Sequence, residues 1–389
     1  MFHRDTWAEI NLDNLYHNVA SMRKHVSPDA KLFAVVKANA YGHGDYEVAQ
    51  TALEAGADYL AVAFLDEALA LRKKGIDAPI LVLGATRPES VNLAADFNIA
   101  LTVFQQEWVD RAKEVIGKGE FLRLHIKCDT GMGRLGVRTE MELTELENVI
   151  RPVPEFMLEG IYTHFATADE LDSEYYDKQV KGFNRLLSSL SERPSIVHAS
   201  NSASALRHPD NDFSAIRMGI TMYGLTPSLE IKDSLPIELK QVMSLKTKIV
   251  HVKELSGGES ISYGAAYTAP GREWVATLPV GYADGWLRKL QGFEVLANGK
   301  RVPIVGRICM DQCMVRLPEF MPVGTEVTLI GQAGDKFISM DEIAVKMETI
   351  NYEVPCIITN RVPRVYLRSG RVKRILNPLL LEENNKLGI

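Results

Sequence analysis

The stretch KLFAVVKANAYGHG, residues 31–44, decides how the fold of this chain is interpreted. It begins as a continuous apolar run, which is typical of a strand buried on both faces. Lys37 stands where the run ends, and Tyr41, Gly42 and His43 follow in a short segment suited to a tight, polar turn. An ammonium group at the point where a buried strand leaves the core indicates a functional turn at the strand's carboxyl end.

Seven further runs of this kind follow before residue 224, and segments with helical periodicity separate most of them. Apolar strands that alternate with helices indicate a parallel sheet covered on both faces. Eight strands within roughly 200 to 250 residues fit a (β/α)8 barrel of the TIM type. We therefore predict a barrel over residues 1–235, with a preceding helix in LDNLYHNVASMRKHV. The eight predicted strands lie in KLFAVVKA, YLAVAF, PILVLG, IALTVF, FLRLHIKC, FMLEGIYTHF, SIVHAS and FSAIRMGI.

From about residue 236 the pattern changes to alternating apolar and polar residues punctuated by glycine, which indicates antiparallel strands. Asn298-Gly299 between two such runs is a strong signal for a two-residue hairpin. One helix is predicted in DEIAVKMETI. We predict a C-terminal, mainly antiparallel β domain over residues 236–389, and the first few residues of the chain are candidates to pair with it.

Composition excludes several classes of protein. The 389 residues carry a formal net charge of -6 without a basic stripe, so we expect no nucleic-acid partner. The N-terminus lacks a signal peptide, and no run approaches the ~18 apolar residues of a membrane span. Cys309 and Cys313 lack the second pair of ligands that zinc requires, so we predict no metal site. The chain is expected to be a reduced, cytoplasmic protein.

Polar residues recur where the predicted barrel strands end. Lys37 follows the first strand, Arg134 the fifth, His164 the sixth and Ser202 the seventh, while Arg217 lies in the eighth. A single lysine at a strand end is most often a surface residue of the barrel rim. Because five strand ends agree, and because barrel enzymes place their chemistry at this face, the pattern indicates an active site.

The glycines of DTGMGRLG match a dinucleotide-binding pattern, Gly131-x-Gly133-x-x-Gly136, and they follow a strand and precede a helix. However, they belong to the fifth strand of the series and do not open a βαβ unit. They also flank Arg134, whose guanidinium is suited to gripping a carboxylate. The sequence favours a carboxylate-binding loop, with nucleotide binding as the alternative.

Several segments together resemble bacterial alanine racemase, in order and across both halves of the chain. This family consists of pyridoxal-phosphate enzymes with a barrel, a β domain and a head-to-tail homodimer, and its members supply D-alanine for peptidoglycan. The resemblance is carried by AVVKANAYGHG, KCDTGMGRLG, THFATAD, NSAS, IRMGITMYG, SYGAAYTA, PVGYADGW, GRICMDQCM and INYEVPC.

The resemblance implies a role for each residue of a cofactor site. Lys37 would hold pyridoxal phosphate covalently, and Arg217 would face its pyridine nitrogen. Lys37 and Tyr263 would be the two bases, for the D- and L-enantiomers, and His164 would join Tyr263 to Arg217 through hydrogen bonds. The phosphate contacts would be Tyr41, Ser202, the backbone N–H groups of Gly219 and Ile220, and Tyr352. On residue type alone, Tyr352 could equally be a core tyrosine of the β domain.

The same resemblance implies how the substrate would be bound. Arg134 and the backbone N–H of Met310 would contact its carboxylate, and Tyr282 would line the entrance. Lys127 matches a position that is a carbamylated lysine in some members of the family. Alternatively, Lys127 is an ordinary lysine paired with a nearby carboxylate.

Three other functions compete with alanine racemisation. An amino-acid decarboxylase of this fold would place an acidic residue where Arg217 stands. A racemase of broader specificity would need a roomier pocket, which the sequence does not exclude. A non-catalytic carrier of pyridoxal phosphate would need the barrel alone, and the β domain with Tyr263 and Tyr352 argues against it.

Overall fold

The computed structural model describes residues 2–211 and 213–380, and it divides the chain into two compact units. One unit comprises residues 14–240, and the other comprises residues 1–13 together with residues 241–389. The sequence suggested a boundary at 235/236 and the first residues as partners of the β domain. In the structure the N-terminal strand β1 (Thr6–Asn11) pairs with two strands of that second unit. None of the described helices is both long and apolar enough to span a membrane.

In the described part of residues 14–240, eight parallel strands form a closed barrel in chain order. The last strand pairs with the first, with Arg217 opposite Phe33, and this confirms the predicted (β/α)8 barrel. Each of the eight apolar runs carries one strand. The strands are β2 (Lys31–Val35), β3 (Tyr59–Val62), β4 (Ile80–Val82), β5 (Ile99–Val103), β6 (Leu122–Lys127), β7 (Phe156–Tyr162), β8 (Ile196–His198) and β9 (Ala215–Met218).

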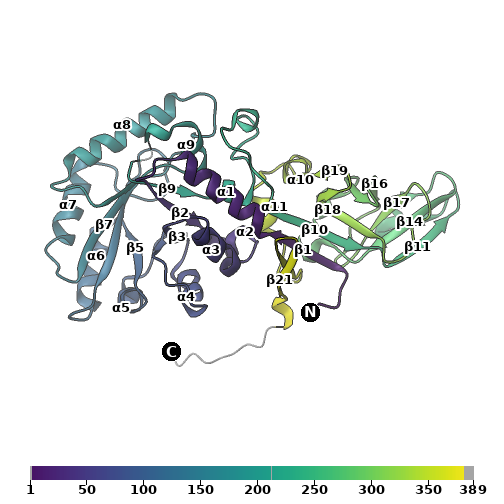
Figure 1. Ribbon diagram of the computed structural model, residues 1–389, viewed down its shortest axis with the longest axis horizontal. Coiled ribbons are helices and arrows are strands. Elements are labelled where there is room, and N and C mark those ends of the chain that lie inside the picture. The colour runs from purple at the N-terminus through teal and green to yellow at the C-terminus, as the bar shows by residue number, and fades with distance from the viewer. Residues whose placement is uncertain (1, 212, 381–389) are drawn as a thin grey trace. The chain divides into compact units, whose positions relative to one another are not determined.

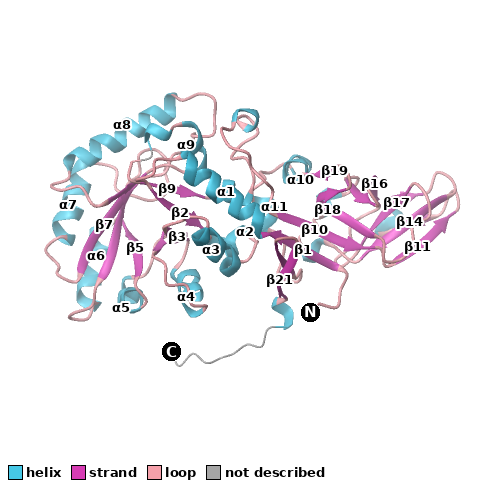
Figure 2. Ribbon diagram, in the orientation of Figure 1, coloured by secondary structure: helices cyan, strands magenta, loops and turns pink. Residues whose placement is uncertain are grey.

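Burial explains the pattern of the barrel elements. Strands β3 and β4 are buried at every residue, as expected where both faces of a parallel sheet are covered. The long outer helix α8 buries Tyr176, Phe183 and Leu187, which are spaced to lie on one helical face. Figure 1 shows α4 to α8 outside the ring of strands, and Figure 2 colours these helices cyan. The helices of this region are α1 (Leu12–His25), α2 (Lys37–Tyr41), α3 (Asp45–Glu54), α4 (Leu65–Lys73), α5 (Val91–Asp96), α6 (Gln106–Val115), α7 (Glu140–Ile150), α8 (Glu174–Ser189) and α9 (Ser202–Arg207).

The second unit is built on one large, mainly antiparallel sheet, which confirms the predicted β domain. Its described strands follow the order β11-β14-β17-β16-β15-β18-β10-β1-β20-β21, with β19 paired to β18. A separate pair, β12 (Ser260–Ile261) and β13 (Tyr267–Thr268), flanks Tyr263. The other strands are β10 (Met243–Lys248), β11 (His251–Leu255), β14 (Glu273–Leu278), β15 (Glu294–Ala297), β16 (Lys300–Val305), β17 (Cys313–Leu317), β18 (Glu326–Ala333), β19 (Lys336–Ile338), β20 (Arg364–Arg368) and β21 (Arg371–Leu376).

Two local predictions in this unit are also confirmed. Asn298 and Gly299 have φ angles of 45° and 71° and join β15 to β16, as a two-residue hairpin turn requires. The predicted helix is α10 (Met340–Met347), and a further short helix is α11 (Glu353–Cys356). Ser339 starts α10 by accepting a hydrogen bond from the Glu342 N–H, while the Glu342 side chain caps the Ser339 N–H in return.

Candidate active site

Lys37 lies two residues beyond the end of β2, at the start of the short segment α2. The next four residues, Ala38 to Tyr41, have φ angles between 51° and 53°, so they form a left-handed turn. That conformation costs an L-amino acid roughly 1–2 kcal/mol per residue. Hydrogen bonds from Gly42 N–H to Ala38 C=O at 3.0 Å and from Gly44 N–H to Asn39 C=O at 2.9 Å close the turn. Backbone strain of this kind persists only where the surrounding structure imposes it, and it is concentrated at functional sites.

His43 and Tyr223 hold the left-handed turn in place. The buried His43 ring places Nδ1 3.1 Å from Ala40 C=O and 2.9 Å from Tyr41 C=O, so this nitrogen must carry the proton and donate. The Tyr223 ring packs on the rings of His43 and Tyr41, with centroids 4.5 and 4.7 Å apart. Its hydroxyl donates to Val35 C=O at 2.9 Å. In the sequence His43 was identified only as part of a polar turn. The structure shows that its side chain supports the backbone of that turn.

Four of the predicted phosphate contacts lie together in the segments that follow β2, β8 and β9. The Gly219 N–H donates to Ser202 Oγ at 2.9 Å, and a Cβ added at Gly219 would come within 3.0 Å of Tyr41 Oη. The Ile220 N–H opens the 3₁₀ turn Ile220–Tyr223, so it has no carbonyl partner within that turn. Hydroxyls and backbone N–H groups without an intervening side chain make a cradle suited to a phosphate.

Arg217 projects from β9 into the barrel, and only 4% of the residue is exposed. Its Nη2 donates to Thr163 C=O at 2.8 Å and to Ala199 C=O at 2.9 Å, and its Nη1 lies 2.8 Å from His198 Nδ1. Burial lowers the pKa of Arg217 to about 10, which still leaves the guanidinium protonated at neutral pH. Strand β9 therefore holds a fixed cation inside the barrel, and this cation can only donate hydrogen bonds.

His164 follows β7, and its Nδ1 lies 3.3 Å from Arg217 Nη2. Burial, together with the charges of Arg217 and Lys127, holds the pKa of His164 well below its ordinary value, so the ring is neutral. Nη2 has two hydrogens, which it donates to the Thr163 and Ala199 carbonyls, so its longer contact with His164 Nδ1 shares one of them. Because Arg217 can only donate, His164 Nδ1 is the acceptor in this contact, and Nε2 carries the proton. The structure thus places His164 Nδ1 next to Arg217 Nη2, while the role of His164 and its link to Tyr263 remain predictions.

Three buried residues that sequence analysis did not single out continue inward from Arg217. They are His198 in β8, His125 in β6 and Glu159 in β7. They stand in SIVHAS, FLRLHIKC and FMLEGIYTHF, three runs that otherwise read as buried strands. An ionisable residue inside a buried strand needs a partner, and this was the available signal, although Arg123 and Lys127 beside His125 made it weak.

The predicted carboxylate-binding loop lies between β6 and α7 and is closed on itself. The Asp129 carboxylate accepts from the Gly131 N–H at 3.1 Å and from the Gly133 N–H at 2.9 Å. A Cβ at Gly136 would lie 2.4 Å from the Asp129 backbone nitrogen, so this position requires glycine. Helix α7 begins at Glu140, beyond the last glycine, and the glycines therefore shape a loop without opening a helix as a dinucleotide site requires.

Arg134 stands exposed in this loop, and among the described residues no carboxylate lies within ion-pair distance of it. Its charge nevertheless helps to lower the pKa values of Lys127, His164 and Arg217, which places all three within its electrostatic reach. A cluster of cations in which Arg134 has no ion-pair partner among the described residues is suited to binding an anion.

Lys127 is 4% exposed, at the end of β6. Its Nζ donates to Cys128 C=O at 2.9 Å and lies 5.1 Å from the centre of the Tyr162 ring, and the described residues offer it no ion pair. Burial and the neighbouring charge of Arg217 lower the pKa of Lys127 to about 7. The alternative of a lysine paired with a carboxylate therefore finds no support in the contacts of Lys127.

In the β unit, Tyr263 is carried by a turn that Ser262 attaches to a neighbouring segment. The Ser262 hydroxyl accepts from the Arg307 N–H at 2.7 Å and donates to the Arg307 C=O at 3.0 Å. Ser262 has a φ of 73°, and Tyr263 itself is 71% exposed. The backbone at Tyr263 is thus held while its side chain remains open to solvent within this unit.

Tyr282 and Met310 are joined by backbone hydrogen bonds. The Tyr282 N–H donates to Cys309 C=O, and the Ala283 N–H donates to Met310 C=O, both at 3.0 Å. A Cβ at Gly281 would lie 2.3 Å from the Met310 carbonyl oxygen, so the two segments are as close as glycine permits. The predicted entrance residue and the predicted substrate contact therefore belong to one rigid pair of segments.

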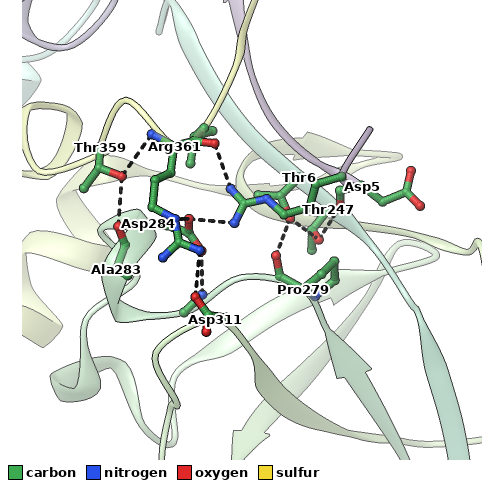
Figure 3. A network of polar contacts seen from close by, with 12 residues as sticks. Asp5, Thr6, Thr247, Pro279, Ala283, Asp284, Asp311, Thr359 and Arg361 are labelled. Atoms are coloured by element: carbon green, nitrogen blue, oxygen red, sulfur yellow. Dashed lines mark hydrogen bonds and ion pairs between the residues drawn. The ribbon is translucent and has the colours of Figure 1, made fainter. Parts of the chain in front are cut away.

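An ion network around the buried carboxylate of Asp284 supports these segments, and Figure 3 shows its contacts. The Asp284 carboxylate, in a residue 1% exposed, accepts from Arg4 Nη1 at 2.7 Å and from the Gly281 N–H at 3.0 Å. Arg361 lies 3.6 Å from the same carboxylate and donates to Asp311 at 2.7 Å. The network ties the turn after Tyr282 to the residue that follows Met310.

Tyr352 lies in the same unit, directly before α11, and is partly exposed. Its contact with a phosphate remains a prediction, as do the roles of Tyr263, Tyr282 and Met310. The structure thus divides the predicted site residues between the two units. The barrel holds Lys37, Tyr41, Lys127, Arg134, His164, Ser202, Arg217, Gly219 and Ile220, and the β unit holds the other four.

Comparison with known proteins covers both units. The family model for the N-terminal domain of alanine racemase matches residues 10–227, and that for the C-terminal domain matches residues 242–366. The alanine racemase of Geobacillus kaustophilus (strain HTA426) is 58% identical over 376 residues, which are 97% of this chain and 98% of that relative.

Solved structures agree with this similarity. The alanine racemase from Bacillus anthracis with bound L-Ala-P has a TM-score of 0.95 at 52% identity, over 97% of this chain and 99% of that chain. A histidine racemase from Leuconostoc mesenteroides subsp. sake has a TM-score of 0.90 at 33% identity, over 95% of this chain and 99% of that chain. Similarity in sequence is therefore greater to these alanine racemases than to the histidine racemase.

Proposed function

Because the chain belongs to the alanine racemase family and interconverts L- and D-alanine, we propose that it does so with pyridoxal phosphate held on Lys37. The observation that carries this proposal is the group of residues around Lys37. Strand β2, which leads into Lys37, pairs directly with β9, which carries Arg217. Tyr41, in the turn after Lys37, lies against Gly219. An amine, an anion cradle and a fixed cation are thus held by adjacent strands.

The barrel residues fit this cofactor group by group. The Lys37 amine would bind its aldehyde carbon, and Tyr41, Ser202 and the N–H groups of Gly219 and Ile220 would bind its phosphate. Any side chain at position 219 would enter the cradle, since a Cβ there already approaches the Tyr41 hydroxyl at 3.0 Å. Tyr352 would be a further phosphate contact.

When bound, the cofactor stabilises the negative charge that develops at the substrate Cα. Racemisation then needs a proton removed from one face of Cα and a proton delivered to the other. We assign the D-enantiomer's proton to Lys37 Nζ and the L-enantiomer's proton to Tyr263 Oη. An unassisted tyrosine has a pKa of about 10, so Tyr263 needs a partner. The neutral His164, which accepts from Arg217, would supply it through Nε2.

Arg217 would face the ring nitrogen of the cofactor. A guanidinium donates a hydrogen bond there without giving up its proton, so the ring nitrogen stays unprotonated. This limits the stabilisation of charge at Cα and thereby disfavours decarboxylation and transamination. Burial and three hydrogen bonds from its terminal nitrogens to protein acceptors hold Arg217 in position, which supports this proposed role. An arginine, where a decarboxylase of this fold would place an acidic residue, argues against the decarboxylase alternative.

The substrate carboxylate would bind between Arg134 and the Met310 N–H, with Tyr282 at the entrance. Arg134 suits this role because no carboxylate among the described residues occupies its guanidinium. The Met310 N–H would be held in position by the backbone bond between Ala283 N–H and Met310 C=O. A charge-assisted contact of this type is worth about 1.5–3 kcal/mol.

Lys127 would be carbamylated. Its pKa of about 7 leaves a large share of the amine neutral, and a neutral amine adds to the carbon of CO2 with loss of one proton. The resulting anion would replace an unpaired cation beside Arg134. With ¹³C-labelled CO2 the native protein should show one carbamate carbon signal that Lys127→Ala lacks. A native spectrum without that signal would exclude the modification.

We further propose a head-to-tail homodimer in which Tyr263, Tyr282, Met310 and Tyr352 of one copy complete the barrel site of the other. The exposure of Tyr263 in its own unit supports this arrangement. The enzyme would be cytoplasmic and would supply D-alanine for peptidoglycan, as the family implies.

Incubation with D-alanine in deuterated water tests the mechanism. We expect L-alanine that carries deuterium at Cα, formed only when pyridoxal phosphate is present. Ethylamine as the product would instead identify a decarboxylase, and bound cofactor with unchanged D-alanine would identify a carrier. Tyr263→Phe should bind cofactor like the native protein and fail to form L-alanine at the native rate.

A further inference from the structure

A continuous chain of four side chains runs through the barrel interior from Arg217 to Glu159. Arg217 Nη1 lies 2.8 Å from His198 Nδ1, His198 Nε2 lies 3.0 Å from His125 Nδ1, and His125 Nε2 lies 2.9 Å from Glu159 Oε2. Both histidines are fully buried, and Glu159 is 7% exposed. Each residue comes from a different strand, and these strands, β6 to β9, are neighbours in the barrel.

The two end groups of this hydrogen-bonded series, Arg217 and Glu159, determine where the protons of the two histidines lie. A guanidinium can only donate, so His198 Nδ1 accepts and His198 Nε2 must carry the proton. An ionised carboxylate can only accept, so His125 Nε2 carries a proton and His125 Nδ1 accepts from His198. With both imidazoles neutral, this is the one arrangement that forms all three hydrogen bonds. Each hydrogen bond in the chain thus points from Arg217 towards Glu159.

Neighbouring groups keep Glu159 ionised. Its Oε1 accepts from the Tyr59 hydroxyl at 3.0 Å and from Arg123 Nη1 at 3.2 Å. Burial alone would raise the pKa of Glu159, but the hydrogen bond from His125 and the charge of Arg123 hold it at about 2. Glu159 therefore remains an acceptor throughout the neutral pH range.

The His198 ring is also fixed in orientation. It stacks between the rings of Phe33 and Tyr162, with centroid distances of 5.1 and 4.5 Å. An additional proton on His198 would place Nδ1–H against the N–H donors of Arg217. An additional proton on His125 would place its Nδ1–H against the Nε2–H donor of His198. Burial lowers the pKa of both histidines, in agreement with two neutral rings.

We propose that Glu159 is a positioning residue for Arg217, acting through His125 and His198. Its carboxylate sets the direction of the three hydrogen bonds and thereby presents an acceptor to Arg217 Nη1. If the direction reversed, His198 Nδ1–H would face Arg217 Nη1–H, and the guanidinium would shift from this position. The consequence for catalysis rests on the proposed function, in which Arg217 faces the cofactor's ring nitrogen.

Glu159→Gln tests the proposal, because an amide can donate to His125 Nε2 and allow both imidazoles to reverse. Glu147→Gln is the matched control. Glu147 is also a buried carboxylate of the barrel, 1% exposed, and it accepts from Arg151 Nε at 2.6 Å and from Ser191 Oγ at 2.7 Å. It has no link to Arg217 among these contacts. Glu159→Asp keeps an anion at the end of the chain and serves as the conservative variant.

The first readout is the ¹⁵N spectrum of histidine-labelled full-length protein, recorded with and without pyridoxal phosphate. In the native protein His125 and His198 should both be neutral with the proton on Nε2. In Glu159→Gln at least one of them should carry it on Nδ1, whereas Glu147→Gln and Glu159→Asp should retain the native tautomers. A proton on Nδ1 of either residue in the native protein would overturn the proposal, even if the glutamine variant failed to fold.

The second readout is steady-state kinetics with alanine. We expect Glu159→Gln to lower kcat by roughly ten- to a hundredfold with KM changed by less than about threefold, because a small displacement of a group at the reaction centre mainly affects the chemical step. Native tautomers in Glu159→Gln, an unchanged kcat, or an equal loss in Glu147→Gln would each contradict the proposal. If the native protein failed to racemise alanine, the proposed function would fall, whereas the tautomers measured without cofactor would still report on the chain.

Discussion

The two units of the molecule hold their candidate site residues in opposite ways. In the barrel, Arg217 and Ser202 are each 4% exposed and make hydrogen bonds within the unit. In the β unit, Tyr263 is 71% exposed and Met310 is 52% exposed, although the backbone on either side is fixed by specific hydrogen bonds. The barrel thus covers most of its candidate site residues, with Arg134 as the exposed exception, whereas the β unit exposes Tyr263 and Met310.

This difference indicates what each half needs. A buried charge is tolerated only where its hydrogen bonds are satisfied, so the barrel half must be organised within its own fold. An exposed aromatic side chain on a rigid turn is typical of a surface that binds another surface. We therefore infer that the barrel half is pre-formed, whereas the β half functions when another copy covers it.

Lys37→Ala should have the largest effect. Loss of both the covalent attachment and one acid–base group should reduce racemisation by at least about 10³-fold. Borohydride should fix the cofactor covalently to the native protein and to Tyr263→Phe, but not to Lys37→Ala. Covalent fixation that persists without Lys37 would show that the barrel half is organised around another amine.

Acid stability tests whether the barrel half depends on its buried carboxylate. The folded pKa of Glu159 is about 2, below its ordinary value of 4.5, so its contribution is fully present above about pH 4.5 and is lost as the pH falls towards 2. That shift corresponds to about 3 kcal/mol. In urea unfolding between pH 5 and pH 2, Glu159→Gln should therefore lose less stability than the native protein. Parallel pH profiles for the two proteins would contradict this contribution.

Arg134 is the exposed member of the barrel half, so its contribution should appear only with substrate. Arg134→Ala should lower kcat/KM for both enantiomers by 2–3 kcal/mol, roughly 30- to 150-fold, because a charge-assisted contact is lost. Arg138→Ala removes another exposed arginine a few residues along the same segment and should leave kcat/KM within about twofold. Equal losses in the two variants would indicate a general effect of surface charge.

Ser262→Ala tests whether the β half depends on a fixed backbone. Loss of the two hydrogen bonds to Arg307 should lower kcat about tenfold, because Tyr263 would no longer be held in position. Ser260→Ala is the control, since among the described residues the Ser260 hydroxyl bonds only to the side chain of Thr268 at 2.9 Å, on the neighbouring strand. Native kcat in Ser262→Ala would show that Tyr263 is positioned by other contacts.

The fold was predictable from the sequence because its two halves differ in periodicity. Strands buried on both faces leave continuous apolar runs, and all eight such runs are barrel strands. The β unit was predictable from alternating apolar and polar residues and from the Asn298-Gly299 pair, which are also local features of the sequence. The candidate site residues were identified by resemblance and by their positions at strand ends, and the roles assigned to them remain predictions.

Other features depend on contacts distant in the chain and could not be derived locally. Nothing in the residue types of Ala38 or Ala40 predicts a left-handed backbone, which His43 and Tyr223 support from outside the turn. The chain from Arg217 to Glu159 is visible only after four strands are placed around one barrel. In sequence it consists of single polar residues far apart.

Mixing two damaged proteins, Lys37→Ala and Tyr263→Phe, tests the central claim most directly. If the two bases come from different copies, each mixed dimer contains one doubly damaged site and one intact site. Random one-to-one reassembly makes about half of the dimers mixed, so roughly a quarter of all sites should recover native activity. Activity that stays at the level of the two parent proteins, despite verified exchange of subunits, would contradict a site shared between copies.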